Sequence, residues 1–253
     1  MDHLKYLIDY LCKESGVQNP QQEYTFDAFR ELVNVRQPIL PNEEFIKIQN
    51  EYLQILVTEK GTIDFDDMQK LNDFVYIWQG DITRMKVDAI VNAANSGMLG
   101  CFHPGHLCID NTIHTYAGIQ LRLECNEIMK KQGTPEPMGQ AKITKAYNLP
   151  CNYIVHTVGP TVGLELGEVE EQQLRKCYQS ILELAHEKKL ESIAICCIAT
   201  GEFHFPHERA CEIAIETVKA VHQKYRERTK VVFNVYKDVD YYLYCDHLQK
   251  IYR

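Results

Sequence analysis

The chain lacks long hydrophobic runs, internal repeats, low-complexity segments and an excess of basic residues. Charged residues Asp2, Lys5 and Asp9 interrupt the apolar positions of its N-terminal stretch, and no other run approaches the length of a membrane span. The sequence therefore predicts neither an export signal nor a membrane anchor. A formal net charge of -8 at pH 7 provides no positive field for nucleic acid or an anionic membrane. An anionic ligand would have to be bound locally, by backbone amides.

The composition is otherwise that of a globular protein with a sizeable core. Of the 253 residues, 45% are hydrophobic and 25% are charged, which is typical of soluble domains. This length suits one large domain or a domain with an appendage. The ten cysteines would suggest disulfides in an exported chain, but without an export signal we expect reduced thiols and a cytoplasmic location.

Hydrophobic spacing divides the chain into two parts. Apolar residues recur at helical spacing in the first part, as at Leu4, Leu7 and Leu11. This region is too small to guarantee an independent core. We therefore expect a helical N-terminal extension, residues 1–70, packed on a core domain of residues 71–253.

The second part alternates short apolar segments, rich in β-branched residues, with helical segments. One helix is expected from about residue 111 to 131, and others follow between about 168 and 252. The alternation predicts an α/β domain in which helices cover a mixed sheet. The expected strands read FVYIWQGD, AIVNAA, AKITKAY, YIVHTVG, SIAICCIAT and KVVFNVY.

Three loops follow expected strands and combine glycine with polar residues. They are GDIT at 80–83, NAANSGMLGCFHPGHLCIDN at 92–111 and ATGEFHFP at 199–206. In α/β sheets, ligands bind where loops leave the strand ends. These loops are therefore the candidate ligand-binding segments.

The longest of these loops contains cysteine and histidine at a spacing that one cation can use. His106 and Cys108 are two positions apart, so an extended segment points both side chains to the same side, and Asp110 continues the series. A Pro-Gly turn at 104–105 allows the chain to fold back and bring Cys101 to the same point. The spacing is thus compatible with a metal site.

The spacing alone leaves several interpretations open. Two thiolates and an imidazole suit Zn²⁺, and three protein ligands leave a fourth position for water or substrate. His103 is a competing ligand, and a site that used it would be closed and structural. A loop without metal is a third interpretation, and a nucleophilic cysteine beside His106 is a fourth. A cysteine nucleophile leaves the second cysteine unexplained, whereas zinc accounts for both.

Five strings, taken in order, make the chain resemble the macrodomain family, which binds ADP-ribose. The match covers about residues 74 to 253, and its specificity lies in the order of the strings. The resemblance implies a three-layer α/β/α fold with a mixed central sheet. The N-terminal helices and the cysteine–histidine insertion further resemble the zinc-dependent branch, which reverses protein ADP-ribosylation in microbes. The strings are GDIT (80–83), VDAIVNAAN (87–95), IDNTIHTYAG (109–118), GQAKITKAYNLPCNYIVHTVGP (139–160) and ATGEFHFP (199–206).

The resemblance also implies roles for individual residues. Asp81 matches the residue that accepts a hydrogen bond from the adenine amino group, and Ile82 the one whose backbone meets the ring. Asn95 matches the residue that contacts the distal ribose. Asp110 matches the catalytic aspartate, although Asn111 replaces the glycine that normally follows it. The implied pyrophosphate loop is Thr200, Gly201, Glu202 and Phe203, and His204 follows it where many macrodomains have glycine. The implied zinc ligands are Cys101, His106 and Cys108, and His103 is not among them.

The implied activity is zinc-dependent hydrolysis that removes mono-ADP-ribose from protein side chains. The bond cleaved would join C1″ of the distal ribose to an Asp or Glu side chain, with Asp110 and Asn95 as catalytic residues and one zinc ion per chain. The alternatives are a non-catalytic reader of ADP-ribose and an O-acetyl-ADP-ribose deacetylase. The implied partner is an ADP-ribosylated protein. Family precedent suggests a lipoyl-carrier protein that a sirtuin-type transferase modifies. Neither nucleic acid nor membrane is an expected partner.

Overall fold

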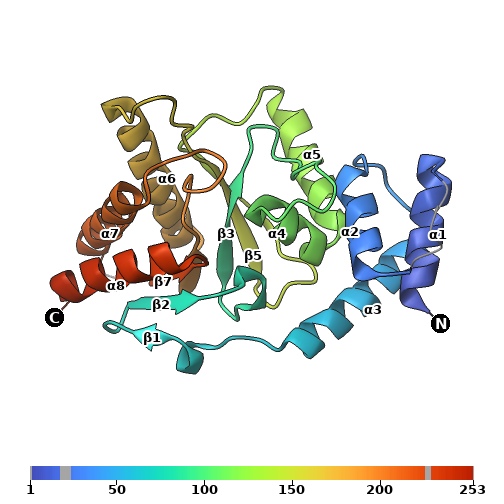
Figure 1. The fold of residues 1–253 in the computed structure, drawn as a ribbon, viewed down its shortest axis with the longest axis horizontal. Coiled ribbons are helices and arrows are strands. Elements are labelled where there is room, and N and C mark those ends of the chain that lie inside the picture. The colour runs from blue at the N-terminus through green and yellow to red at the C-terminus, as the bar shows by residue number, and fades with distance from the viewer. Residues whose placement is uncertain (1, 18–23, 226–228, 253) are drawn as a thin grey trace.

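The computed structural model describes residues 2–17, 24–225 and 229–252, which form a mixed sheet between layers of helices (Figure 1). Within these ranges the sheet has seven strands in the order β1-β2-β7-β6-β3-β5-β4. The strands are β1 Gln69–Lys70, β2 Val75–Gln79, β3 Ala89–Ala94, β4 Ala141–Lys145, β5 Tyr153–Val158, β6 Ser192–Ile195 and β7 Lys230–Val235.

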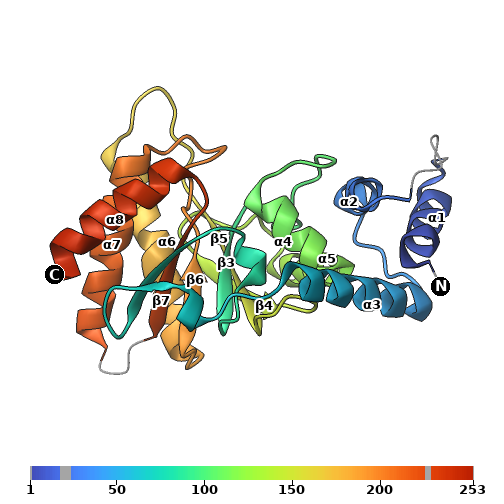
Figure 2. The same ribbon diagram turned by 60° about the horizontal axis from the view of Figure 1, so that its bottom comes forward.

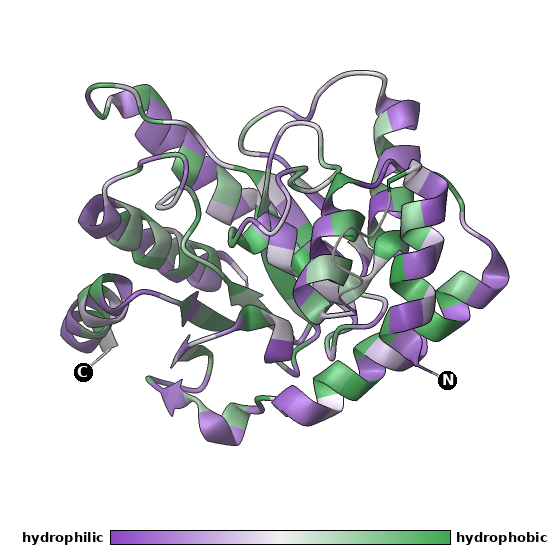
Figure 3. Ribbon diagram, turned by 45° about the vertical axis from the view of Figure 1, so that its right-hand side comes forward, coloured by the Kyte–Doolittle hydropathy of each residue, from purple (hydrophilic) through white to green (hydrophobic). Residues whose placement is uncertain are grey.

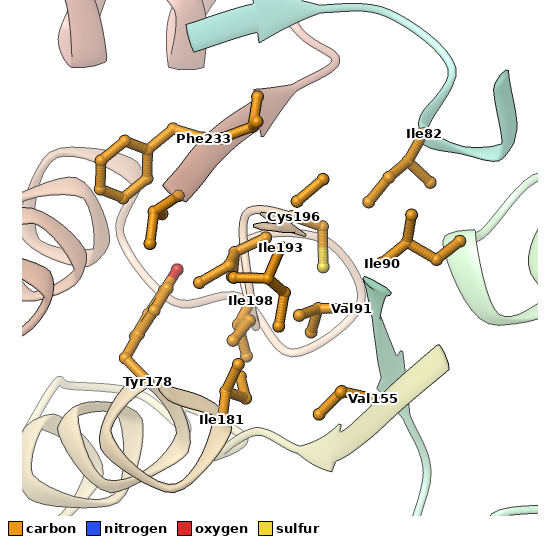
Figure 4. Close-up of a cluster of buried hydrophobic side chains, with 14 of the residues drawn as sticks. Ile82, Ile90, Val91, Val155, Tyr178, Ile181, Ile193, Cys196, Ile198 and Phe233 are labelled. Carbon is orange, nitrogen blue, oxygen red and sulfur yellow. The ribbon is translucent and has the colours of Figure 1, made fainter. Parts of the chain in front are cut away.

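The inner strands of the sheet pair in parallel, and the two outer strands, β1 and β4, pair antiparallel to their neighbours. Parallel strands with helices on both faces are buried on both faces, so their sequences are almost continuously apolar. In β3 only Ala93 is not fully buried. Figure 4 shows side chains from β3, β5, β6, β7 and α6 gathered in the resulting core.

Helices cover both faces of the sheet. Two helices, α4 (Ile109–Ala117) and α5 (Ile119–Gln132), lie on one side, and α6 (Glu168–Glu187), α7 (His207–Lys224) and α8 (Asp238–Tyr252) lie on the other (Figure 2). This arrangement confirms the predicted three-layer fold with a mixed sheet. No helix in the described ranges has the length and apolar character needed to cross a membrane.

The single helix predicted over residues 111–131 is wrong, because the chain forms two helices that meet at Gly118. Gly118 has φ +93°, a backbone conformation that side chains disfavour, and a Cβ there would lie 2.7 Å from Nε2 of Gln49. The Gln49 side chain, from the N-terminal helices, accepts a hydrogen bond from the backbone N–H of Ile119. The backbone N–H that follows the break is therefore paired with a side chain that is distant in sequence.

Three helices precede the sheet in the described part of the N-terminal region, residues 2–17 and 24–68, and they share a small core of their own, which Ile119 of α5 joins. Each begins at a polar residue, Asp2, Thr25 or Asn42, whose side chain accepts a backbone hydrogen bond from the first turn. Apolar and polar residues alternate around these helices (Figure 3). The helices are α1 His3–Ser15, α2 Phe26–Val35 and α3 Glu43–Lys60, followed by two 3-10 turns, η1 Phe65–Asp67 and η2 Ile82–Arg84.

Candidate metal centre and ligand site

The loop between β3 and α4 leaves the carboxyl end of β3 at Asn95. The Asn95 side-chain amide donates to the carbonyl of Gly100 at 3.1 Å and to Oδ2 of Asp110 at 3.2 Å. Its Oδ1 accepts from the backbone N–H of Gly97 at 2.9 Å. Asn95 therefore fixes the start of the loop and at the same time contacts the aspartate at its end.

Asp110 is 5% exposed and lies in the first turn of α4. The expectation that it continues an extended series from Cys108 is wrong, because α4 begins at Ile109 and turns the chain. Oδ1 of Asp110 accepts a 2.8 Å hydrogen bond from the Asn92 amide. Burial raises the pKa of Asp110 to about 6, against the opposing effects of the Asn92 and Asn95 hydrogen bonds and the Arg122 charge. A positioned carboxyl group with a pKa close to neutrality can exchange protons with a bound ligand.

The side chains of Cys101, His106 and Cys108 converge, with their potential ligand atoms all within 4.8 Å of one another. Cys101 Sγ lies 3.5 Å from His106 Nδ1. The chain reverses at Gly105, which has φ +62°, as the Pro-Gly turn predicts. The cluster does not include His103, although its ring lies 6.0 Å from that of His106 between centroids. Two sulfur donors and one imidazole within this distance fit a zinc ion.

Cys108 also caps α4, since its Sγ accepts a hydrogen bond from the backbone N–H of Asn111 at 3.4 Å. Burial raises the pKa of the Cys108 thiol to about 12. A nucleophilic cysteine needs a lowered pKa, so this environment disfavours Cys108 as a nucleophile.

The loop after β6 folds into a tight turn near the loop between β3 and α4, residues 95–108, which is called the cysteine–histidine loop below. Ala199 and His204 both have left-handed backbone conformations, with φ of 66° and 56°. The left-handed conformation at 204 explains why glycine suits this position. Thr200 is buried and donates to the carbonyl of Cys197, whereas a Cβ placed on Gly201 would have no atom within 4 Å.

Glu202 and Phe203, in the same loop, make different contacts. Oε1 of Glu202 lies 3.6 Å from Nε2 of His106, so the two loops meet, although the glutamate is largely exposed and the contact is therefore weak. Phe203 is partly buried and packs on the main core. The predicted pyrophosphate and metal loops are thus brought into contact at one edge of the sheet.

Asp81 lies after β2 and caps η2, since its Oδ1 accepts from the backbone N–H and the hydroxyl of Thr83. Its Oδ2 accepts a 2.8 Å hydrogen bond from Nζ of Lys60, at the end of α3. Lys60 Nζ also lies 3.7 Å from the centroid of the Tyr116 ring. Burial would raise the pKa of Asp81, but the bonds from Lys60 and Thr83 outweigh it and hold the pKa below its ordinary value. Ile82 follows and is buried.

Sequence reasoning did not identify Asn92 and Lys60 as parts of these sites. Asn92 lies within the VNAAN string. A polar residue on an otherwise apolar strand indicates a buried hydrogen bond, and this pattern could have identified it. Lys60 had no such signal, because its contact with Asp81 joins residues 21 positions apart in different elements.

Behind Asp110, the fully buried His156 of β5 completes the polar network. The Asn92 amide donates to His156 Nδ1 at 3.1 Å, so Nε2 carries the proton and donates to the Thr144 hydroxyl at 2.9 Å. Burial lowers the pKa of His156 to about 3. The histidine is therefore neutral in the folded protein across the physiological range.

We expect His156 to make the protein less stable as the pH falls from about 6.5 towards 3. In this window the unfolded histidine binds a proton that the folded one does not, so stability falls by up to about 1.4 kcal/mol per pH unit. Urea unfolding of metal-free His156→Gln should show a pH 7 to pH 5 loss about 2 kcal/mol smaller than wild type. His3→Gln, which replaces a partly exposed histidine, is the control and should lose about as much stability as the wild type between pH 7 and pH 5. An equal loss in wild type and His156→Gln would contradict the prediction.

Comparison with known proteins gives concordant matches. The model of the family described as Macro domain matches residues 91–214. A protein-ADP-ribose hydrolase of Treponema medium is 48% identical over 94% of this chain and 95% of its own length. One from Staphylococcus aureus strain MRSA252 is 44% identical over 95% and 93%. Among solved structures, the Oceanobacillus iheyensis macrodomain with ADP has a TM-score of 0.65 and 33% identity, covering 73% of this chain and 95% of that chain. The Trypanosoma brucei macrodomain in complex with ADP-ribose has a TM-score of 0.66 and 27% identity, covering 87% and 94%.

Proposed function

This chain belongs to the macrodomain family, and on that premise we propose that it removes mono-ADP-ribose from modified protein side chains in a zinc-dependent hydrolysis. The observation that carries the proposal is that the loop between β3 and α4 presents three potential metal ligands, while Asn95 at its start contacts the buried carboxylate of Asp110, which follows it in α4. The relatives from Treponema and Staphylococcus, which are named protein-ADP-ribose hydrolases, support the hydrolysis of ADP-ribose from protein in this proposal.

The ligand would extend along the carboxyl edge of the sheet. We assign the adenine to Asp81 and the backbone of Ile82, where the carboxylate can accept from the amino group. The pyrophosphate belongs to the turn at 200–203, because the open approach to Gly201 lets backbone amides contact phosphate oxygens. The distal ribose then lies near Asn95 and Asp110.

The reaction proposed breaks the bond between C1″ of the distal ribose and an Asp or Glu side chain. Asp110 orients or deprotonates the attacking group, since both of its oxygens are fixed by asparagine amides. Asn95 contacts a hydroxyl group of the distal ribose and holds it next to the Asp110 carboxylate. A zinc ion held by Cys101, His106 and Cys108 would supply Lewis acidity at this end of the ligand.

The test is release of ADP-ribose from Glu-linked and Ser-linked ADP-ribosyl proteins, with metal analysis of the same samples before and after chelation. Zinc-dependent release from the Glu-linked substrate supports the proposal. Stoichiometric binding without release identifies a reader instead, and faster turnover of O-acetyl-ADP-ribose identifies a deacetylase. A modified lipoyl-carrier protein, compared with an unrelated Glu-modified protein, tests the partner that the resemblance implies.

Replacing Asp81 by alanine is expected to weaken ADP-ribose binding by about 10- to 100-fold, the value of a hydrogen bond to a charged group. Titration calorimetry with ADP-ribose measures the change. Asp64→Ala is the matched control, because Asp64 also caps a 3-10 turn, η1, and faces a lysine, Lys86, at 3.7 Å. Equal effects of the two substitutions would show that capping, and not contact with the ligand, explains the loss.

A further inference from the structure

Helix α2 of the N-terminal extension lies directly against the cysteine–histidine loop and the start of α4 (Figure 1). Arg30, which is 7% exposed, projects from α2 into this junction. Its Nη2 donates to the backbone carbonyl of His106 at 2.8 Å and to Oδ1 of Asn111 at 2.9 Å, with the Thr112 hydroxyl at 3.3 Å. Its Nε also donates to Asn111 Oδ1, at 3.1 Å. One guanidinium group thus holds the chain on both sides of Cys108.

Asn34, one turn further along the same face of α2, holds the tip of the loop. It is 1% exposed, and its Oδ1 accepts from the backbone N–H of Gly105 at 3.0 Å. Its amide donates to the Thr115 hydroxyl of α4 at 3.1 Å. The turn that returns the chain from Cys101 to His106 is therefore fixed by a side chain of the extension.

The beginning of the loop is tied to α2 through Arg122 of α5. Arg122 donates to the carbonyl of Leu99 at 2.6 Å and to the carbonyls of Val33 and Arg36, at the end of α2, at 2.9 and 2.5 Å. Its guanidinium lies 4.4 Å from the centroid of the Phe102 ring. A cation at the carboxyl end of a helix is favoured by the exposed carbonyls there. The loop is thus attached to α2 at its start, its tip and its end.

From these contacts we infer that α2 is part of the metal centre and that Arg30 is a positioning residue for His106 and Cys108. The inference deepens the proposed function and rests on the metal site assigned there. The loop itself has no regular secondary structure between Asn95 and the start of α4. Ordering such a segment has an entropic cost, and the contacts from α2 offset part of this cost before any ion binds.

An arginine is needed at this position because the N–H donors of its planar guanidinium group reach several acceptors at once. Lysine carries the same charge but presents a single ammonium group, which cannot hold the His106 carbonyl and the Asn111 amide oxygen in the same geometry. Arg30→Lys should therefore resemble Arg30→Gln more than wild type. A purely electrostatic role for Arg30 would instead let lysine restore the wild-type behaviour.

The test compares Arg30→Gln with Arg36→Gln in the full-length protein. Arg36 is the matched control, since it is also 7% exposed at the end of α2 but its side chain pairs with Glu14 of α1. The substitution keeps the backbone carbonyl of residue 36, which is the group that accepts from Arg122. Zinc affinity is measured by competition with a chromophoric chelator, and site geometry by the visible spectrum of the cobalt(II)-loaded protein. Amide exchange of peptides covering residues 99–112 is followed in the metal-free protein.

We expect Arg30→Gln to bind zinc about 10- to 100-fold more weakly, as for other residues that orient metal ligands, with an altered cobalt spectrum and faster exchange in the loop. Arg36→Gln should retain the wild-type zinc affinity, spectrum and loop exchange. A folded Arg30→Gln with wild-type loop exchange and zinc affinity would overturn the inference.

A second variant covers the case in which Arg30→Gln does not fold. Asn34→Ala leaves Arg30 in place and removes only the side chain that holds Gly105, so it should also weaken zinc binding and speed loop exchange. Wild-type values for Asn34→Ala would then count against a role for α2. If the wild-type protein binds no zinc, the proposed metal-dependent function fails, while the loop exchange of the Arg30 variant still decides whether α2 positions the loop.

Discussion

Cys101→Ala and Cys108→Ala are each expected to lower the rate of ADP-ribose release by about 10³-fold, the equivalent of several kcal/mol of Lewis-acid stabilisation of the transition state. Affinity for free ADP-ribose should change little, because the adenine and pyrophosphate contacts assigned to Asp81 and Gly201 lie on other loops. The measurements are single-turnover release from a Glu-linked ADP-ribosyl protein and calorimetric titration with ADP-ribose.

The control for these substitutions is Cys12→Ala, a change at another partly buried free cysteine, on α1 and outside the metal cluster. It should retain the wild-type rate and zinc content. Both site variants must first be shown to be folded by circular dichroism and free of metal by elemental analysis. Release at the wild-type rate by such samples would rule out the metal-dependent mechanism, while leaving the binding of ADP-ribose intact.

Much of the fold could be predicted because its determinants are local. Buried parallel strands are short apolar segments, and each predicted segment after residue 74 contains the strand that the structure shows, as at Ala89–Ala94 and Tyr153–Val158. The break at Gly118 could not be predicted from spacing. Apolar residues continue at helical intervals across it, and the side chain that accepts a hydrogen bond at the break, Gln49 of α3, is far away in sequence.

The same distinction applies to the candidate site. Cys101, His106 and Cys108 are close in sequence, so their spacing indicated the cluster that the structure contains. Two of the side chains that hold this loop, those of Arg30 and Asn34, come from positions 76 and 71 residues away from their partners, and no local pattern marks them. In the sequence alone, Asn111 is only a departure from glycine. Its side chain accepts from Arg30 and donates to the carbonyl of His103, so the departure belongs with the N-terminal extension.

Replacing Asp110 by asparagine is expected to lower turnover by about 10²- to 10⁴-fold, the contribution of a positioned general acid or base. Both carboxylate oxygens accept hydrogen bonds from amide groups, Oδ1 from Asn92 and Oδ2 from Asn95. An asparagine would direct its own NH₂ group at one of these donors, which disturbs the network in addition to removing the proton acceptor. ADP-ribose should still bind, because Asp110 contributes to the reaction more than to recognition of the adenine or pyrophosphate.

Asp88→Asn separates this effect from a general loss of stability. Asp88 precedes the amino end of β3, opposite the site, and its Oδ2 accepts from the backbone N–H groups of Glu191 and Ser192. The substitution should lower the unfolding midpoint but preserve turnover at a temperature where the protein stays folded. Asp110→Asn should instead show low turnover with zinc content unchanged, even at a temperature where it stays folded. A folded, zinc-containing Asp110→Asn that releases ADP-ribose at the wild-type rate would mean that the proton acceptor is another group, and the network of Asn92, Asn95 and Asp110 would then serve only to close the loop.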